Sequence, residues 1–580
     1  MAKKTKNEVE FLTQPELIVV VKDDAQLTTS GDTVATASNV SSTSLNKLLK
    51  SKKLKMTPLY GTSEEEVDAS IASLNTEQAD QLQGLSLYYF IDYPENANLD
   101  DLCQEFCNND LVETAYIKPG AEPATYMDDT LVEEAPQDIV DSPAPVNFVS
   151  RQGYLNQAPG GIDARYAWTQ SGGKGQGIKV VDVEGGWNFN HEDLRQNQGG
   201  VIAGTNSTNS GWRNHGTAVI GVIGGDENTI GITGIAPRAN TRAVSIFGTG
   251  MSSSRAIKRA ADSLQAGDVI LIELHRAGPR FNFQARADQK GYIAMEWWPD
   301  DYNAILYASL KGIIVVEAAG NGAENLNSSI YNNKPASFPS SWSNPFRRST
   351  YRDSGAIIVG AGAPPPGTHG RNHGPDRSRL NFSNYGSCVD AQGWGREVTT
   401  TGYGNLFGGG NQNRQYTDTF SGTSSASPIV VGAIACTQGV LKARGRILLT
   451  PARVRDLLRS TGSPQTSAPG RPRSQRIGNR PNLRQLIARA LHQNNWFGVQ
   501  FSGKVPSGAS RRWFTHSWPA HWIVHWDVIP TAPLQNSPAQ LEFKVQRTRQ
   551  SHKHVKYYIE VKNLSNKEIS FDARYAVLGW

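Results

Sequence analysis

The central part of the chain carries four strand-like runs rich in Val and Ile, separated by stretches with helical periodicity. These runs lie at residues 178–183, 268–274, 312–316 and 356–361. Strands that are apolar on both faces and alternate with helices form a parallel sheet that helices cover on each side. We therefore predict an α/β domain whose active site lies at the carboxyl ends of its strands, where the connecting loops gather.

The region before this domain differs from it in pattern. Residues 12–120 alternate short β-like and helical runs, which predicts a small α+β domain after a flexible N-terminus of residues 1–11. Residues 121–149 then contain seven acidic residues, four prolines and no basic residue. Because such a segment cannot bury a core, we interpret it as an exposed linker and a domain boundary.

Beyond residue 493, aromatic residues alternate with turn residues. Residues 521–528 place Trp522 and Trp526 on one face and polar side chains on the other, the pattern of a half-buried strand. We therefore predict a small β-sandwich over residues 494–580. The central domain is then bounded at residues 150–493.

Composition excludes several classes of partner. The net charge is +5 over 580 residues, and no concentrated basic patch stands out, so we expect no nucleic-acid partner. The longest early apolar run, residues 17–21, is far shorter than the roughly 20 residues of a membrane span. It is also shorter than the about 7–15 residues at the centre of a secretory signal. We therefore expect no membrane span, and either a cytoplasmic location or export by a non-classical route.

Three separated segments carry the residue types of nucleophilic catalysis. Asp182 lies in the first strand run, His215 in the segment Asn-His-Gly-Thr, and Ser424 in Gly-Thr-Ser-Ser-Ala-Ser-Pro at the start of a helix. A serine hydroxyl is inert at neutral pH without a base in hydrogen-bond reach, and a carboxylate behind the imidazole sets its tautomer. The amides at the helix start favour a developing negative charge. By their chemistry, Asp182, His215 and Ser424 can form one triad if the fold brings the three segments together.

These segments resemble the signatures of the subtilase family of serine peptidases, with His-Glu-Asp-Leu at residues 191–194 and Ser-Asn-Tyr-Gly at residues 383–386 as further matches. The resemblance extends over residues 150–490. It implies a subtilisin-like fold and a serine endopeptidase that hydrolyses peptide bonds through an acyl-enzyme. It also implies that Asn321 donates its side-chain amide to the oxyanion, together with the Ser424 backbone amide.

The same resemblance bears on the N-terminal region and on partners. Residues 12–120 have the size and position of a subtilase pro-domain, although their sequence match is poor. The resemblance implies a zymogen in which this domain is an intramolecular inhibitor that covers the active site and is cut within residues 119–150. The other partner is a protein or peptide substrate.

A structural calcium ion is a further implication of the resemblance, whereas the chemistry needs no cofactor. Calcium takes six to eight oxygen ligands, which include backbone carbonyls. The loop that follows the His215 helix provides such oxygens, and the alternative is an ordinary polar turn. The expected ligands are Asp193, Asp226, Asn228, Ile230 and Ile232.

The chain departs from the family pattern beside the cleft. Val183 and Glu184 replace the hydroxyl and glycine that usually follow the aspartate. With Glu273 and Glu317, three glutamates would attract basic side chains, which predicts a basic specificity pocket. The alternative is that these carboxylates are solvated or internally paired. The residues expected to bind substrate are Glu273, Leu274, His275, Glu317, Ala318 and Gly320.

Other functions fit the same sequence. An acyl-enzyme can be resolved by an amine, which would make the protein a transpeptidase or macrocyclase. A catalytically silent scaffold, with the C-terminal module as the binding part, is a third reading. Mass spectrometry of the products separates ligation from hydrolysis. Labelling of Ser424 by a fluorophosphonate tests whether the protein is a catalytically silent scaffold.

Overall fold

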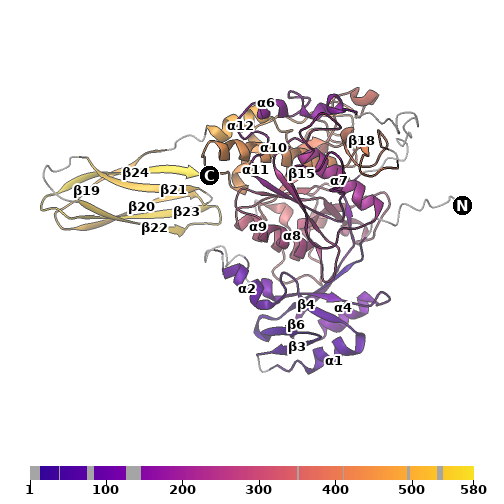
Figure 1. The fold of residues 1–580 in the computed structure, drawn as a ribbon. Coiled ribbons are helices and arrows are strands. Elements are labelled where there is room, and N and C mark those ends of the chain that lie inside the picture. The colour runs from indigo at the N-terminus through magenta and orange to yellow at the C-terminus, as the bar shows by residue number, and fades with distance from the viewer. Residues whose placement is uncertain are drawn as a thin grey trace.

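The computed structural model places three bodies along the chain (Figure 1). A sheet with helices lies at the N-terminal end, an α/β domain lies in the centre, and a long β-sandwich extends from the central domain. The sequence predictions for residues 1–11 and for most of the linker, residues 126–145, lie outside the described residues. The structure describes residues 13–37, 40–72, 74, 82, 84–125, 146–348, 352–408, 410–492, 497–520, 522–531 and 540–579.

The central domain is built on a sheet of seven strands in the order β16-β15-β14-β11-β8-β10-β9, all paired in parallel. The predicted parallel α/β fold is therefore confirmed. The strands, in sheet order, are β16 (Val389–Trp394), β15 (Ile357–Gly362), β14 (Ile314–Ala318), β11 (Val269–Ile272), β8 (Lys179–Glu184), β10 (Asn240–Ser245) and β9 (Gln198–Ala203).

Helices cover both faces of this sheet because successive strand residues point to opposite faces. On β8, Val181 and Val183 pack in one core with α8 (Ser253–Asp262) and α9 (Pro299–Leu310). Val180 packs on the other face in a second core. The helices of that second face are α6 (Ala164–Trp168), α7 (Ser210–Gly224), α10 (Thr423–Ala443), α11 (Pro451–Ser460) and α12 (Leu483–Leu491).

Helix α10 is long and apolar enough to cross a membrane by length and composition, but the whole of its apolar window is buried inside the fold. It packs against the sheet and against α7. It is therefore the central core helix of this domain.

The N-terminal domain is an antiparallel sheet of order β4-β5-β1-β6 with helices on one face. Its other face packs against α8 and α9 of the central domain, where residues such as Ile18 and Tyr116 share a core with Ala256 and Ile305. The elements are β1 (Glu16–Val21), the hairpin of β2 (Leu27–Ser30) and β3 (Thr33–Thr36), α1 (Thr43–Lys52), β4 (Lys55–Pro58), α2 (Glu64–Ala72), β5 (Tyr88–Asp92), α4 (Leu99–Cys107) and β6 (Val112–Lys118).

A cluster of buried charges joins these two domains. The Lys118 ammonium at the end of β6 lies 2.5 Å from Asp300, 3.2 Å from Asp301 and 2.9 Å from Glu16, and its side chain is fully buried. Arg276 of the central domain donates to the other oxygen of Glu16 at 2.5 Å. Since an unpaired buried charge is strongly unfavourable, each domain completes the charge balance of the other.

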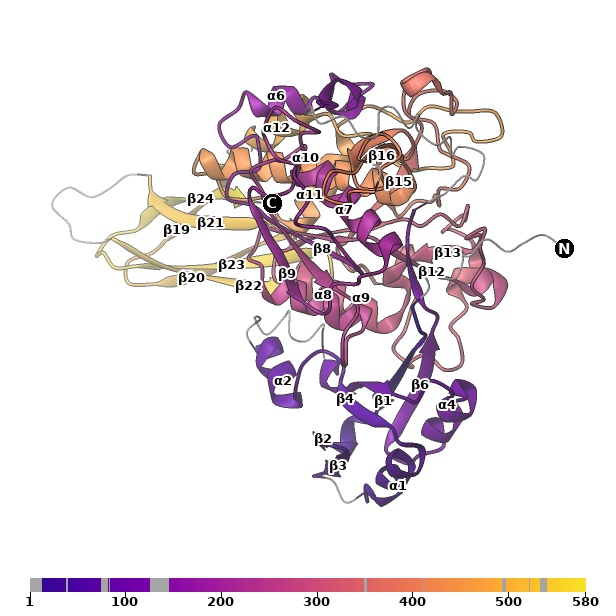
Figure 2. The same cartoon turned by 45° about the vertical axis from the view of Figure 1, so that its right-hand side comes forward.

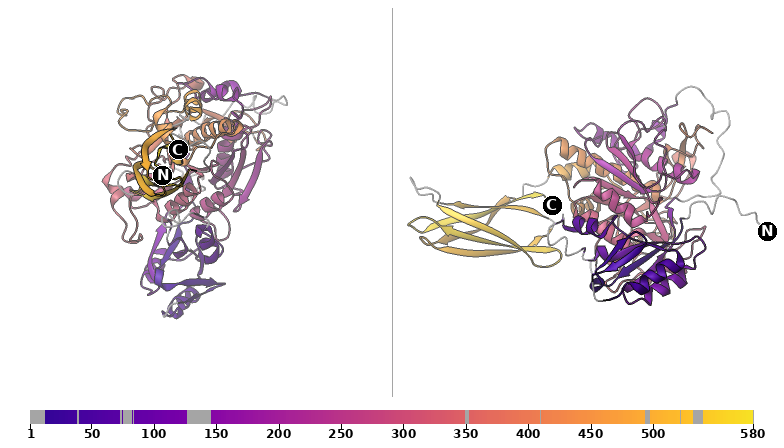
Figure 3. Two further views of the ribbon diagram at one scale, coloured as in Figure 1. Left: turned by 90° about the vertical axis from the view of Figure 1, so that its left-hand side faces the viewer. Right: turned by 60° about the horizontal axis from the view of Figure 1, so that its bottom comes forward.

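The C-terminal domain consists of two antiparallel three-stranded sheets, which confirms the predicted β-sandwich. It projects away from the central domain in the right-hand view of Figure 3. Its core is formed by residues such as Trp526, Ile559 and Phe571. The sheets are β19 (Phe497–Val505), β24 (Ile569–Gly579) and β21 (Ile523–Pro530), and β20 (Ser510–Pro519), β23 (His554–Asn563) and β22 (Leu541–Arg549).

Candidate active site

A histidine on α7 and a glutamate at the end of β8 form a buried pair. Nδ1 of His215 lies 2.7 Å from Oε2 of Glu184, and both side chains are fully buried. Glu184 is the last residue of β8, at the edge of the sheet where the strands end. Glu184 points to the same face as Val180, which is the face that α7 covers. The pairing therefore follows from the strand period and the position of the helix.

Asp182 lies two residues earlier on the same face of β8. Its Oδ2 accepts a hydrogen bond from Nε1 of Trp187 at 2.7 Å, and its Oδ1 has no hydrogen-bond partner among the described residues. The structure therefore corrects the expectation that Asp182 binds His215. Asp182 lies one strand period deeper in the sheet, and Glu184 at the strand end occupies the position beside the imidazole.

Gly216 allows this close approach. A Cβ atom at residue 216 would lie 2.3 Å from Oε1 of Glu184 and 2.6 Å from the Trp187 ring. Any larger residue after His215 would therefore displace the carboxylate. The glycine of the Asn-His-Gly-Thr segment has a steric function in this chain.

Burial controls the protonation of this pair. Desolvation lowers the pKa of His215 to about 3, although the nearby Asp182 charge opposes the shift. Burial also raises the pKa of Glu184 well above its ordinary value. A neutral imidazole with its proton on Nδ1 leaves Nε2 free to accept a proton, as a general base must.

Ser424 is the second residue of α10 and is fully buried. No hydrogen bond joins its Oγ to Nε2 of His215, and Nε2 has no partner among the described residues. Hydrogen bonds between catalytic groups are often long before the substrate complex forms. The structure thus brings Glu184 and His215 together and leaves the bond from His215 to Ser424 open.

Asn321 follows β14 at the same edge of the sheet. Its Oδ1 accepts hydrogen bonds from the backbone amide and the hydroxyl of Thr423, both at 3.0 Å. These two bonds fix the orientation of the side-chain amide, and Nδ2 donates to Oε1 of Gln289 at 3.1 Å. An amide nitrogen carries two hydrogens, so one remains for an oxyanion.

The segment that follows the N-terminal domain lies in this site as an added strand. Strand β7 (Ala121–Pro123) pairs antiparallel with β12 (Leu274–Ala277), which pairs on its other edge with β13 (Tyr292–Ala294). Figure 2 shows the chain running from β6 up onto the central domain beside β12 and β13. This part of the predicted linker is thus a buried strand, because β12 offers it an open edge.

The added strand ends at the serine. The carbonyl oxygen of Ala124 accepts a hydrogen bond from the backbone amide of Ser424 at 3.1 Å, and Ala124 is fully buried. The Thr125 hydroxyl donates to the carbonyl of Ser421 at 3.3 Å. The Ala124 carbonyl therefore lies on one of the two donors expected to stabilise an oxyanion.

The expected substrate residues fall into two groups. Leu274 and His275 lie on β12 directly opposite Pro123 and Glu122. Gly320 lies close to the same sheet, since a Cβ there would be 3.2 Å from the carbonyl oxygen of Tyr292. Ala318 ends β14, within the buried core.

The three glutamates do not surround one pocket. Glu273 lies two residues after Leu271 and therefore points to the face of the sheet that α10 covers. There its carboxyl lies near Asp182, Glu184 and the Ser424 hydroxyl. Glu317 lies on the opposite face of the sheet, and its Oε2 accepts from the Glu296 amide at 3.2 Å. The structure therefore does not form the predicted pocket for basic side chains. Odd-numbered residues of β11 and β14 point to opposite faces of the sheet, so Glu273 and Glu317 lie apart.

Comparison with known proteins agrees with this geometry. The sequence pattern of the Subtilase family, peptidase S8, matches residues 163–481, more than half of the chain. The chain belongs to the subtilase family. Its central domain is therefore a serine peptidase domain, and the resemblance drawn from the motifs is confirmed.

Individual relatives are distant. Subtilisin NAT from Bacillus subtilis subsp. natto is 27% identical over 345 residues, which span 59% of this chain and 75% of that protein. Alkaline elastase YaB from Bacillus sp. (strain YaB) is 29% identical over 262 residues, 45% of this chain and 54% of that protein. The crystal structure of fervidolysin, a keratinolytic enzyme from Fervidobacterium pennivorans, aligns with a TM-score of 0.47 at 16% identity, over 98% of this chain and 70% of that chain.

The expected calcium ligands of this subtilase domain lie together but are already hydrogen bonded. Asp193 accepts from the Asn228 amide at 2.8 Å and from the Ile232 backbone amide at 2.6 Å. Both oxygens of Asp226 accept from backbone amides, and the Ile230 amide donates to Asn228. Burial raises the pKa of Asp193 to about 8. In this arrangement the carboxylates do not fit calcium, which would have to replace these bonds, and calcium binding stays a prediction.

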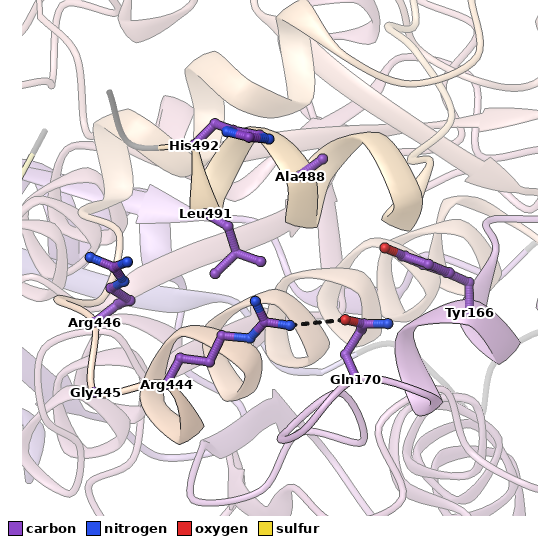
Figure 4. A pocket seen from close by; sticks show the side chains of 8 residues that line it. All are labelled: Tyr166, Gln170, Arg444, Gly445, Arg446, Ala488, Leu491 and His492. Atoms are coloured by element: carbon purple, nitrogen blue, oxygen red, sulfur yellow. Dashed lines mark hydrogen bonds between the residues drawn. The ribbon is translucent and has the colours of Figure 1, made fainter. Parts of the chain in front are cut away.

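One surface hollow of the subtilase domain lies away from Ser424. A hollow of about 520 Å³ is bounded by α6, α12 and the C-terminal end of α10, where Arg444 donates to Gln170 at 3.0 Å (Figure 4). Ser424 lies at the other end of α10, about 30 Å away at 1.5 Å per residue. This hollow therefore has no part in the chemistry, and the cleft beside Ser424 is filled by residues 121–125.

The sequence placed Glu184 beside the cleft but not as the partner of His215, and it did not indicate a role for Gln289 or Tyr292. Glu184 ends the apolar run directly before Gly185 and Gly186, but this position alone does not distinguish it from Asp182 as the partner of His215. Residues at strand ends carry the chemistry of such sheets. Gln289 and Tyr292 lie in the long segment of residues 279–295, whose course the sequence does not reveal.

Proposed function

We propose that the chain is a serine endopeptidase made as a zymogen, with Glu184, His215 and Ser424 as its triad. The observation that carries this proposal is the Ala124 carbonyl, which lies 3.1 Å from the Ser424 amide in a strand paired with β12. A peptide carbonyl in that position is placed for attack by the adjacent hydroxyl.

The reaction follows from these groups. Oγ of Ser424 bonds to the carbonyl carbon while Nε2 of His215 takes the hydroxyl proton, and Glu184 stabilises the imidazolium. The carbonyl oxygen becomes an oxyanion, which accepts hydrogen bonds from the Ser424 backbone amide and from the second hydrogen of Asn321 Nδ2. Collapse breaks the C–N bond as His215 returns its proton to the leaving amine. Water then hydrolyses the acyl-enzyme. The reaction therefore needs only side chains of this protein, the peptide and water.

We further propose that Ala124–Thr125 is the bond at which the chain cuts itself. The part of the chain before this bond then stays bound as an inhibitor, because the sheet of residues 13–118 packs on α8 and α9 and strand β7 fills the cleft. This bond lies inside the range, residues 119–150, that the sequence predicts.

The test is the mass of the purified protein after incubation, together with probe labelling. We expect a fragment that begins at Thr125, and labelling of Ser424 by a fluorophosphonate probe once residues 1–124 are removed. An unactivated serine does not react with such a probe. Absence of both the fragment and the label would contradict the proposal, and ligated products would favour a transpeptidase.

Replacing Asn321 by leucine is expected to lower kcat by about 10²–10³-fold with little change in KM, because one oxyanion donor is lost. Leucine has the same branched arrangement of heavy atoms as asparagine but no polar atom, so it also removes the acceptor of the two Thr423 hydrogen bonds. The measurement is the hydrolysis of a peptide that spans residues 119–128. Asn325→Leu, in the loop four residues further on, is the control, and equal losses in the two variants would contradict the assigned role.

Replacing Lys118 by methionine is expected to weaken the inhibitory domain. Breaking a buried ion cluster by removing one partner costs about 3–5 kcal/mol, because the remaining charges stay buried. The inhibition constant of cleaved residues 1–124 should therefore rise by about 10²–10³-fold. Lys52→Met is the control, since Lys52 pairs with Glu105 at a surface where both side chains are exposed. An unchanged inhibition constant for Lys118→Met would exclude this role of the cluster.

A further inference from the structure

A glutamate of the added strand is held by two side chains of the central domain. Glu122 lies two residues before Ala124, so in an extended strand the two side chains point to the same side. The Tyr292 hydroxyl donates a hydrogen bond to Oε1 of Glu122. The Gln289 side chain is the second hydrogen-bond partner of this carboxyl. The central domain thus binds the Glu122 side chain with two polar groups. Glu122 belongs to the segment that occupies the cleft as a substrate would.

We propose that this cleft selects peptides that carry glutamate at the third residue before the cleaved bond, with Tyr292 and Gln289 as the residues that recognise it. The inference rests on the proposed function, since it takes Ala124 as the residue whose carbonyl is attacked. Ala124 is then the first residue before the bond, Pro123 the second and Glu122 the third.

The register of the three strands places the recognising groups on one face. His275 of β12 lies directly opposite Glu122 of β7 and Ala294 of β13. Tyr292 is two residues from Ala294 and therefore points to the same face. Its ring packs on the His275 ring with centroids 4.7 Å apart. The Tyr292 hydroxyl consequently lies beside the third residue of any peptide that pairs with β12 in this register.

Contacts outside the added strand also hold Tyr292 in place. Its carbonyl oxygen accepts a hydrogen bond from Nδ2 of Asn384 at 2.7 Å. Gly322 packs against its backbone so closely that a Cβ there would lie 2.2 Å from the same oxygen. The Tyr292 hydroxyl accepts from the Arg286 amide at 3.3 Å, which leaves its proton for a carboxylate. Preorganisation of this kind lowers the cost of binding.

Gln289 connects this site to the oxyanion donor. Its Oε1 accepts the hydrogen bond from Nδ2 of Asn321 at 3.1 Å, while its amide acts on the Glu122 carboxyl. A glutamate in this position is thus hydrogen bonded to Gln289, and Gln289 is hydrogen bonded to the Asn321 amide that we expect to stabilise the oxyanion. We therefore expect the glutamate to act on kcat as well as on KM, because it stabilises the catalytic orientation of Asn321.

A double-mutant cycle in the full chain tests the inference, with the rate of self-cleavage at Ala124–Thr125 as the readout. Glu122→Leu and Tyr292→Phe should each slow cleavage by about 10- to 100-fold, the range expected for a lost hydrogen bond to a charged group. The double variant should be little slower than either single variant, because both remove the same interaction. Independent, multiplying losses or unchanged rates would overturn the inference.

A second measurement protects the test from misfolded variants. The processed protein cleaves a pair of peptides that span residues 119–128 and differ only in Glu or Leu at the position of residue 122. The ratio of the two kcat/KM values does not depend on the active fraction. It should favour Glu by about 10- to 100-fold in the wild type and approach unity in Tyr292→Phe. A wild-type ratio near unity would overturn the inference.

The control variant is Tyr307→Phe, which also removes a hydroxyl that donates to a carboxylate, here Asp262 at 2.8 Å on the far side of the sheet. It should keep the wild-type ratio. Failure of the proposed function has a different signature, because the wild-type chain would then cleave neither itself nor either peptide. Cleavage of both peptides at equal rates would contradict the glutamate site and leave the peptidase assignment intact.

Discussion

Replacement of Glu184 by glutamine is expected to slow self-cleavage by about 10⁴-fold, the loss typical of a triad whose carboxylate becomes an amide. The glutamine amide would donate to Nδ1 of His215, so the imidazole would carry its proton on Nε2. That tautomer cannot accept the Ser424 proton. The measurement is the rate at which the full chain forms the fragment that begins at Thr125.

Asp182→Asn is the matched comparison, because it makes the same chemical change one strand period away. Asp182 accepts a hydrogen bond from Nε1 of Trp187 at 2.7 Å, and the side-chain oxygen of asparagine can accept the same bond. The change also removes a charge that raises the pKa of its carboxylate neighbour Glu273. We therefore expect a far smaller loss than in Glu184→Gln. A larger loss in Asp182→Asn would reverse the assignment of the triad acid.

Replacement of Ser424 by alanine is expected to lower the rate by about 10⁶-fold, the size of loss that follows removal of the triad nucleophile. Over hours the chain should therefore stay at its full mass of 580 residues, with Ala124–Thr125 intact. Intact mass spectrometry measures this directly. Removal of one oxygen from a buried residue leaves the fold of α10 unchanged.

Ser425→Ala is the control for the nucleophile. The neighbouring hydroxyl hydrogen bonds to the Trp394 carbonyl at 2.9 Å and to the Gly422 carbonyl at 3.1 Å, and the described residues show no hydrogen bond from it to the added strand. This variant should cut itself as the wild type does. If Ser424→Ala produced the same fragment at the wild-type rate, another protease would be responsible, and the proposed self-processing would be excluded.

The architecture of the central domain could be predicted because its pattern is local. Each strand is a short apolar run, and runs such as residues 178–183 and 312–316 predict β8 and β14 within a few residues. His215 and Ser424 were identifiable because their motifs lie at helix positions that place side chains at the strand ends. These features depend on a few neighbouring residues, so no long-range contact is needed to recognise them.

The carboxylate that pairs with His215 could not be decided in the same way. Asp182 and Glu184 lie on one strand and one face, about 7 Å apart at 3.3 Å per residue, and both are buried. Local pattern treats them alike. Only the depth at which α7 packs on β8 sets which carboxylate meets Nδ1 of His215.

By itself the sequence determined the parallel sheet, the family, and the histidine and serine of the site, since period and motif are written in consecutive residues. Tertiary structure alone decided that Glu184 rather than Asp182 pairs with His215, and that Glu317 turns to the opposite face from Glu273. It also decided that residues 121–125 fill the cleft. The physical reason is that these contacts join segments distant along the chain, and their partners are chosen by packing depth and by the open edge of β12.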